Sequence, residues 1–127
     1  MTEHFHTPED PRVFVFGSNL LGIHGAGAAR YAAQELGFPK TPCGRKGRAY
    51  AIPTCEEPGK PLPLWDIGCY VGFFMFHARK NPQDRFFVSA IGCGFAGYKE
   101  SDIAPLFKGC PENCDLPPGW REMCSRS

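Results

Sequence analysis

Short apolar runs alternate along the chain with segments of helical periodicity. The runs Arg12–Phe16 (RVFVF), Ala49–Thr54 (AYAIPT) and Arg85–Ile91 (RFFVSAI) are rich in β-branched and aromatic residues, which predicts strands. Pro53 is expected to mark the end of the second strand. The third is apolar on both faces, so we expect it to be central in a sheet. A last short strand is expected over Asn113–Pro117.

Helical spacing is clearest from about Leu64 to Lys80, where apolar residues recur three and four positions apart: Leu64, Ile67, Val71, Phe74 and Ala78. This spacing predicts an amphipathic helix. Alanines between Gly25 and Gly37 predict a second helix that can lie close to a sheet. A short third helix is expected over Glu100–Gly109.

The alternation of strands and helices predicts an α/β fold, specifically a three-layer αβα sandwich with a mostly parallel central sheet. The segment Pro39–Arg48 is rich in glycine, proline and cations, and we expect it to be a loop. The 127 residues fit a single domain. Residues 1–10 and 120–127 are expected to be tails.

Glycines gather directly after the first and third predicted strands, in GIHGAGAAR (Gly22–Arg30) and in IGCGFAGY (Ile91–Tyr98). In open parallel sheets, ligands bind beyond the carboxyl ends of the strands. A helix that begins near Gly25–Ala28 presents unpaired N–H groups that favour an anion, and glycine lets the backbone approach phosphate oxygens closely. We therefore expect both loops to hold one phosphate-bearing ligand. The alternative is that these glycines only make tight turns and close helix–sheet contacts.

Several other phosphate and catalytic motifs are missing. The chain has no G-x-x-x-x-G-K-S/T sequence and no G-x-S-x-G elbow, and GIHGAG lacks the acidic residue of a dinucleotide-binding fingerprint.

Charge and hydrophobicity limit the classes of partner and the location that we expect for this protein. The net charge of +1 gives no overall field toward nucleic acid or an anionic membrane. Four cations in Lys40–Arg48 leave nucleic-acid binding as a weaker alternative to a solvated loop. No apolar run approaches the ~20 residues of a membrane span, and the first residues do not resemble a signal peptide, so a cytoplasmic protein is expected.

The seven cysteines are expected to be structural or reduced thiols. Zinc binding through Cys110 and Cys114 is the alternative, but it lacks a second paired motif. We expect no metal site and no cofactor.

The motifs FGSN, GIHGAGAA and IGCGFAGY together resemble the macro domain, a fold that binds ADP-ribose and related nucleotides. The resemblance runs from about Val13 to Leu106. It is closest to the branch that contains terminal ADP-ribose protein glycohydrolases and ADP-ribose 1''-phosphate phosphatase-like proteins.

The resemblance implies roles for residues of both loops. Asn19 would bond the ribose distal to adenine, and Gly25, Ala26 and Gly27 would approach that ribose and its phosphate. The second loop would wrap the diphosphate with Gly92, Cys93, Gly94, Phe95, Ala96 and Gly97, while Tyr98 or Phe95 lies along a sugar or base. Alternatively, Asn19 caps a turn and Phe95 belongs to the core.

The chain departs from this branch at its catalytic positions. Ala96 stands where the glycohydrolases carry an Asp, and Ala33 or Gln34 where they carry a Lys. Asp10 is the nearest match to the family's adenine-binding Asp. His24 is the remaining acid–base candidate beside Asn19; the alternative is a loop histidine that only forms hydrogen bonds.

The expected function is binding of ADP-ribose or a related nucleotide diphosphate, with hydrolysis of an ADP-ribose derivative left open. The alternative is a non-catalytic module that sequesters a nucleotide signal or recognises ADP-ribosylated protein.

Overall fold

The computed structural model describes residues 5–125 as a mixed α/β fold. Six strands form one sheet. Five of them follow the order β2 (Gly44–Lys46), β3 (Ala49–Glu57), β1 (Val13–Asn19), β5 (Phe86–Val88) and β6 (Cys114–Asp115), and β4 (Lys60–Pro61) also pairs with β3. The pairs that β1 makes with β3 and β5, and the pair of β5 with β6, are parallel. The expected α/β class with a mostly parallel sheet is confirmed.

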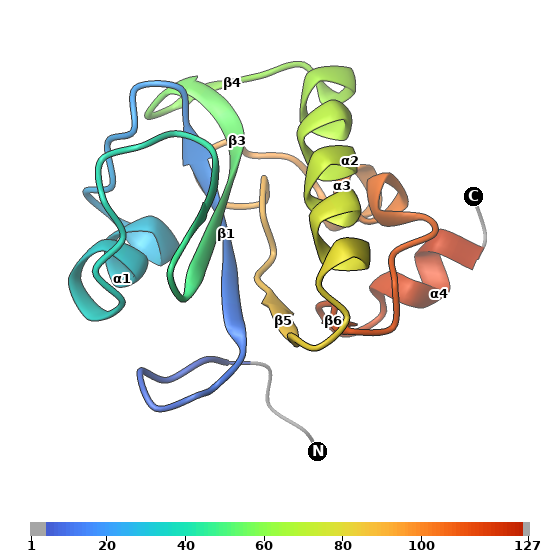
Figure 1. Ribbon diagram of the computed structural model, residues 1–127. Coiled ribbons are helices and arrows are strands. Elements are labelled where there is room, and N and C mark those ends of the chain that lie inside the picture. The colour runs from blue at the N-terminus through green and yellow to red at the C-terminus, as the bar shows by residue number, and fades with distance from the viewer. Residues whose placement is uncertain (1–4, 126–127) are drawn as a thin grey trace.

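Side chains of β1 alternate between the two faces of the sheet, and each face has its own apolar cluster. Val13 and Val15 belong to the larger cluster, which includes residues of α2 (Leu64–Lys80), α3 (Glu100–Ile103), the 3₁₀ segment η1 (Ala104–Phe107) and α4 (Trp120–Ser125). Phe14 and Phe16 belong to the smaller cluster, which α1 (Gly27–Glu35) joins through Ala32. In Figure 1, α1 and α2 accordingly lie on opposite sides of the strands.

The helix expected over Leu64–Lys80 is confirmed with those bounds, and Ile67, Val71, Phe74 and Ala78 are all buried in it. Apolar residues three and four positions apart predicted this face correctly, because an α-helix has 3.6 residues per turn. The expected helix over Glu100–Gly109 is shorter: it begins as α3 and continues as η1 only to Phe107.

The segment Pro39–Arg48 is not entirely a loop, because β2 pairs antiparallel with β3 across a two-residue turn at Gly47 and Arg48. Gly47 has a φ of +58°, which such hairpin turns require. Pro53 does not end β3, which continues to Glu57. It falls between the residues that pair with β2 and β4, at a register shift opposite β1, where a missing N–H is tolerated.

The expected tails are corrected for the described residues; residues 1–4 and 126–127 lie outside them. The His6 ring is hydrogen-bonded to the Tyr31 hydroxyl (2.7 Å) and to the Arg12 carbonyl oxygen (2.9 Å). At the other end, Trp120 is fully buried, and its indole Nε1–H donates to Glu100 Oε1 at 2.6 Å. Arg121 of the same helix donates to the carbonyl oxygens of Cys110, Pro111 and Cys114, so contacts distant in sequence hold a six-residue helix that has no apolar periodicity of its own.

Replacement of Trp120 by Ala should lower the free energy of unfolding by about 3–5 kcal/mol, because it empties a large buried site and removes the partner of Glu100. Chemical denaturation would measure the change. Phe95→Ala, which removes a ring that is 64% exposed, should change the stability by less than about 0.5 kcal/mol. Equal effects of the two substitutions would contradict the placement of α4.

Candidate functional site: a cavity at the carboxyl ends of β1, β3 and β5

Both glycine loops line one cavity of about 530 Å³. It lies where the parallel strands β1, β3 and β5 end, and residues at or just after the end of each strand line it. The expectation that the loops meet at one edge of the sheet is therefore confirmed. The described residues that line it are Gly17, Ser18, Asn19, Ile23, Gly25, Ala26, Gly27, Ala28, Ala29, Thr54, Cys55, Pro58, Ser89, Ala90, Ile91, Gly92, Gly94, Phe95 and Ala96.

The cavity exists because β5 ends early. The expected strand over Arg85–Ile91 pairs with β1 only as far as Val88. At Ser89, the backbone N–H and the hydroxyl both donate to the Val15 carbonyl oxygen, at 2.9 and 2.7 Å. The chain then leaves the ladder, while β1 continues to Asn19 and leaves space beside its last residues.

A side chain would be crowded at one glycine of this wall and both crowded and strained at another. A side chain at Gly17 would meet Thr54 Oγ1 at 3.3 Å and the Gly92 nitrogen at 3.6 Å. Gly92 has a φ of +76°, and a Cβ there would lie 2.7 Å from Ile103 Cδ1. Because Gly92 has no side chain, the second loop can pack closely against Ile103 of α3.

Main-chain N–H groups are the available donors in the cavity. The first turn of α1 has no side-chain cap and no acidic residue, and no hydrogen bond within residues 5–125 uses the N–H of Gly27, Ala28 or Ala29. The same holds for Gly94, Phe95 and Ala96 in the described part of the second loop. Residues of both sets line the same cavity, and unpaired amides at a helix start favour an anion.

The side-chain hydroxyls of the cavity are already engaged with the backbone. Thr54 Oγ1 donates to the Ser18 carbonyl oxygen at 3.3 Å, and Ser89 is bonded to β1. Both residues were missed by the sequence reasoning, as was Cys55. The signal was available for Thr54, since a strand that lies parallel to β1 must also end at this edge.

Asn19 lines the cavity and also braces the first loop. Its side-chain Nδ2 donates to the Ile23 carbonyl oxygen at 2.7 Å, and its Oδ1 accepts from the Ile23 N–H at 3.1 Å. The turn-capping alternative is thus observed. One amide N–H and one lone pair of Oδ1 stay free of these bonds, so a contact to a ligand is compatible with the bracing role.

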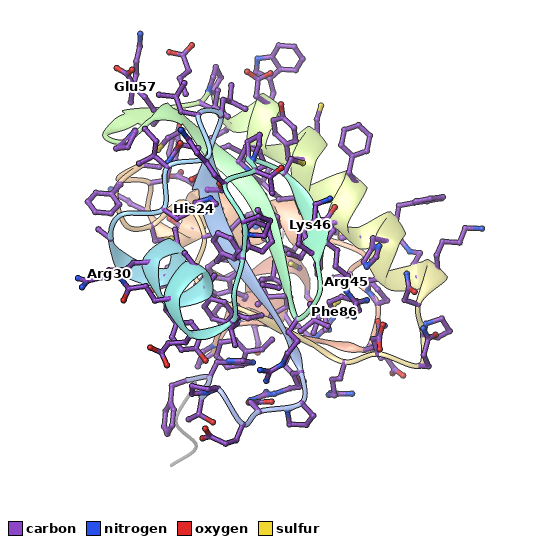
Figure 2. All side chains as sticks on the ribbon, turned by 60° about the vertical axis from the view of Figure 1, so that its left-hand side comes forward. His24, Arg30, Arg45, Lys46, Glu57 and Phe86 are labelled. Carbon is purple, nitrogen blue, oxygen red and sulfur yellow. The ribbon has the colours of Figure 1, made fainter. Side chains whose placement is uncertain are left out.

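His24 does not line the cavity. Its ring lies 5.5 Å from the Phe16 ring and 5.6 Å from the Phe38 ring, measured between centroids, and its Nε2 is 3.1 Å from Ser18 Oγ. It lies near the strand edge beside α1 in Figure 2. Burial lowers the pKa of His24, which favours the neutral imidazole over the charged one. His24, the candidate acid–base group, therefore lies on the core side of the first glycine loop and not among the residues that line the cavity.

Three residues of the second loop also lie away from the cavity. Cys93 and Tyr98 pack against the larger core cluster, and the Tyr98 hydroxyl donates to the Leu62 carbonyl oxygen at 2.6 Å. Burial raises the pKa of the Cys93 thiol, and Glu100 and Asp102 raise it further. Gly97 donates its N–H to Gly94 O at 3.0 Å and closes the loop. Phe95, by contrast, lines the cavity and is exposed, so it is not core.

No charged side chain lines the cavity among the described residues. Asp10, the nearest match to an adenine-binding Asp, forms an ion pair with Arg12 at 2.6 Å, and the hydrogen bond from Arg12 lowers its pKa to about 2. Arg30 extends from α1 into solvent (Figure 2). An anion in this cavity would thus be held by main-chain dipoles.

Cations of the segment Lys40–Arg48 are partly used within the fold. Arg45 forms an ion pair with Asp84 at 2.7 Å and lies 5.9 Å from the centre of the Phe86 ring (Figure 2). Arg48 donates to the carbonyl oxygens of Pro8 and Asp10. These contacts are those of a structural surface segment.

The described cysteines are all free. Cys110 and Cys114 are neighbours, and a hydrogen bond with Cys110 raises the pKa of the Cys114 thiol. No group of three or more His, Cys, Asp or Glu within residues 5–125 is arranged to hold a metal ion. Within the same residues, no helix has both the length and the apolar character needed to cross a bilayer.

Gly92→Ala should destabilise the protein by about 1–3 kcal/mol, because the new Cβ meets Ile103 and an L-residue at positive φ is strained. Gly94→Ala is the matched control in the same loop: a Cβ at Gly94 would have no atom within 4 Å, and its φ is not positive. Thermal or urea unfolding of both variants would test this. A Gly94→Ala loss as large as that of Gly92→Ala would contradict the described packing.

Stability should fall as the pH drops below about 6.5, the ordinary pKa of histidine, partly because of His24. The unfolded imidazole takes up a proton there, whereas the folded one does so only at lower pH, so the unfolded state binds more protons. His24→Gln should reduce this slope in unfolding measurements across pH. An NMR titration that places the His24 pKa at or above 6.5 would contradict the burial of its ring.

In comparisons with known proteins, no family model matches this chain, and neither a curated protein nor a solved structure matches it.

Proposed function

We propose that this protein binds a nucleotide diphosphate, of which ADP-ribose is the leading candidate, in the cavity between the two glycine loops. The observation that carries the proposal is the convergence of unpaired main-chain N–H groups from the start of α1 and from Gly94–Ala96 on one cavity without a carboxylate. A diphosphate offers acceptor oxygens to both sets at once. Its charge would be stabilised by the helix dipole and by amides already fixed in place.

The size and polarity of the cavity agree with such a ligand. About 530 Å³ lies within the range of small-molecule sites. Ile23, Ile91 and the exposed Phe95 ring supply apolar contacts beside the amides. These are suited to the faces of a ribose or a base.

A neighbouring cavity supports a ligand longer than a diphosphate. It shares Gly27, Ala28, Ser89 and Ala90 with the first, and is otherwise lined mainly by rings: Phe5, His6, Phe14, Tyr31 and Phe87. Aromatic faces stack on bases. A nucleotide could therefore lay its phosphates in the first cavity and its base toward these rings.

Binding without turnover is the better supported form of the proposal. Among the described residues that line the first cavity, no carboxylate, imidazole, amine or phenol is present to transfer a proton, and His24 lies on the core side of its loop. The neighbouring cavity does contain such groups, but they are bonded within the fold: His6 to Tyr31, and Glu100 to Trp120. The module that sequesters a nucleotide or recognises ADP-ribosylated protein is therefore favoured over the hydrolase. The macro-like three-layer αβα arrangement and a cytoplasmic location belong to the same proposal.

Calorimetric titration with ADP-ribose, ADP and AMP tests the proposal. The wild type should bind ADP-ribose and ADP more tightly than AMP, because AMP reaches only one of the two sets of amides. Gly94→Glu should lower the affinity at least tenfold, since its carboxylate would repel the diphosphate. Gln34→Glu, which adds the same charge at an exposed position of α1, is the matched control and should leave the affinity unchanged.

Two outcomes would overturn the proposal. A folded wild type that binds none of the three nucleotides would reject the ligand class. Binding that survives Gly94→Glu unchanged would reject the site. Turnover of ADP-ribosylated protein or of ADP-ribose 1''-phosphate that is lost in His24→Ala would restore the hydrolase.

A further inference from the structure

The outer face of α2 carries three large aromatic side chains that are mostly exposed. Trp65 is 74% exposed, Phe73 63% and Phe76 59%, and Cys69 between them is exposed as well. Together with Gly72 these residues form the outer row of α2: Trp65, Cys69, Gly72, Phe73 and Phe76. Figure 2 shows side chains of this helix, rings among them, extending away from the body of the molecule.

The outer row is unusual because the inner face of α2 is already fully apolar. Ile67, Val71 and Phe74 are completely buried against the sheet. A helix that is apolar on both faces is ordinarily covered on both. The three exposed rings offer roughly 400 Å² of aromatic surface, which is the size of a patch that usually marks an interaction site.

The spacing of the outer row is that of a helix–helix seam. Trp65, Cys69, Gly72 and Phe76 follow one another at intervals of four, three and four residues. This is the a/d spacing at which two helices pack along a shared line. Gly72 has no atom within 4 Å of a Cβ position, so it leaves a hollow in the middle of the seam.

We propose that the outer row of α2 is a homodimer interface, in which α2 of a second copy of this chain packs antiparallel across a two-fold axis between Gly72 and Phe73. In that register each Phe73 ring enters the hollow at the other copy's Gly72. Cys69 meets Phe76, a sulfur–aromatic contact. A two-fold axis makes every such contact occur twice.

Charge complementarity fixes the direction and identifies the partner as a second copy. The same register brings Asp66, in the first turn of α2, opposite Arg79 in the last turn, and brings Trp65 opposite Lys80. Arg79 uses one guanidinium nitrogen to donate to Gly109 O at 2.9 Å, which leaves further donors for a carboxylate. Lys80 already holds its ammonium group 5.4 Å from the centre of the Phe76 ring, beside the seam. A parallel pairing would place like charges together at both ends.

The area approaches that of a specific contact. Two copies would bury roughly 800 Å² of aromatic surface alone. The flanking side chains of Asp66, Arg79 and Lys80 extend this toward the ~1,200 Å² at which stable interfaces begin. The glycine loops lie at the strand ends and the first of them leads into α1 on the other face of the sheet (Figure 1), so dimerisation leaves the cavity open.

Sedimentation or light scattering of the full chain, over a low- to high-micromolar series, tests the interface. The wild type should be a dimer, and Phe73→Glu should shift it to the monomer. Leu21→Glu, which places the same charge on a side chain 51% exposed outside the row, should remain dimeric. Circular dichroism would establish that each variant is folded.

Charge exchange tests the register itself. Asp66→Arg and Arg79→Asp should each weaken the dimer at least tenfold, because like charges then face each other. The double variant D66R/R79D restores opposite charges in the same register and should regain most of the affinity. A single-copy structural role for either residue would not produce this rescue.

The proposal fails if the wild type is monomeric throughout the series, whether or not it sediments with anionic lipid vesicles. It also fails if a dimer forms that Phe73→Glu does not disrupt. A dimer that single charge reversals weaken but the double exchange does not rescue would reject the antiparallel register.

Discussion

The pairing of β1 with β3 on one side and β5 on the other is the interaction on which the candidate site depends. Because all three strands run in the same direction, their carboxyl ends reach one edge, and each contributes a segment to the cavity. The pairing is stabilised from both faces: Val13 and Val15 are buried in one apolar cluster, and Phe14 and Phe16 in the other. A one-residue slip of β1 would exchange these faces, so the register that fills the cores also aligns the two glycine loops.

The hydrogen-bond donors of the cavity are main-chain amides, which do not act as acids or bases near neutral pH, and they are set in a fixed frame. Its hydroxyls are bonded to strand backbone, and Asn19 is bonded to its own loop. What remains unpaired is main chain, held in place before any ligand arrives, so little reorganisation is required on binding. Under the proposed function, such a surface would recognise its ligand by charge and shape.

The sequence was sufficient for those parts of the fold that depend on local pattern. The apolar spacing of α2 and the run of β1 predicted both elements, and the position of the glycines after two strands predicted where they would meet. It was insufficient where a contact distant in sequence decides the structure. The chain leaves β5 where Ser89 bonds to Val15, and α4 is held by the burial of Trp120 and by the hydrogen bonds of Arg121. The orientation of the His24 ring depends on its contacts with Phe16 and Phe38. The residue pattern of its loop therefore could not predict that orientation.

The indole of Trp120 ties the last described helix to the residues that follow the second glycine loop. Its bond ends on Glu100, the first residue of α3, and Ile103 of the same short helix is the side chain against which Gly92 rests. Loss of α4 would remove the partner of Glu100 and weaken the packing of α3 against the second glycine loop. The segment itself does not line the cavity. If the cavity holds an anion that orders the loop, as the proposed function implies, reciprocity requires that the anion also stabilise the packing of α4, so occupancy of the cavity would slow proteolysis of this segment.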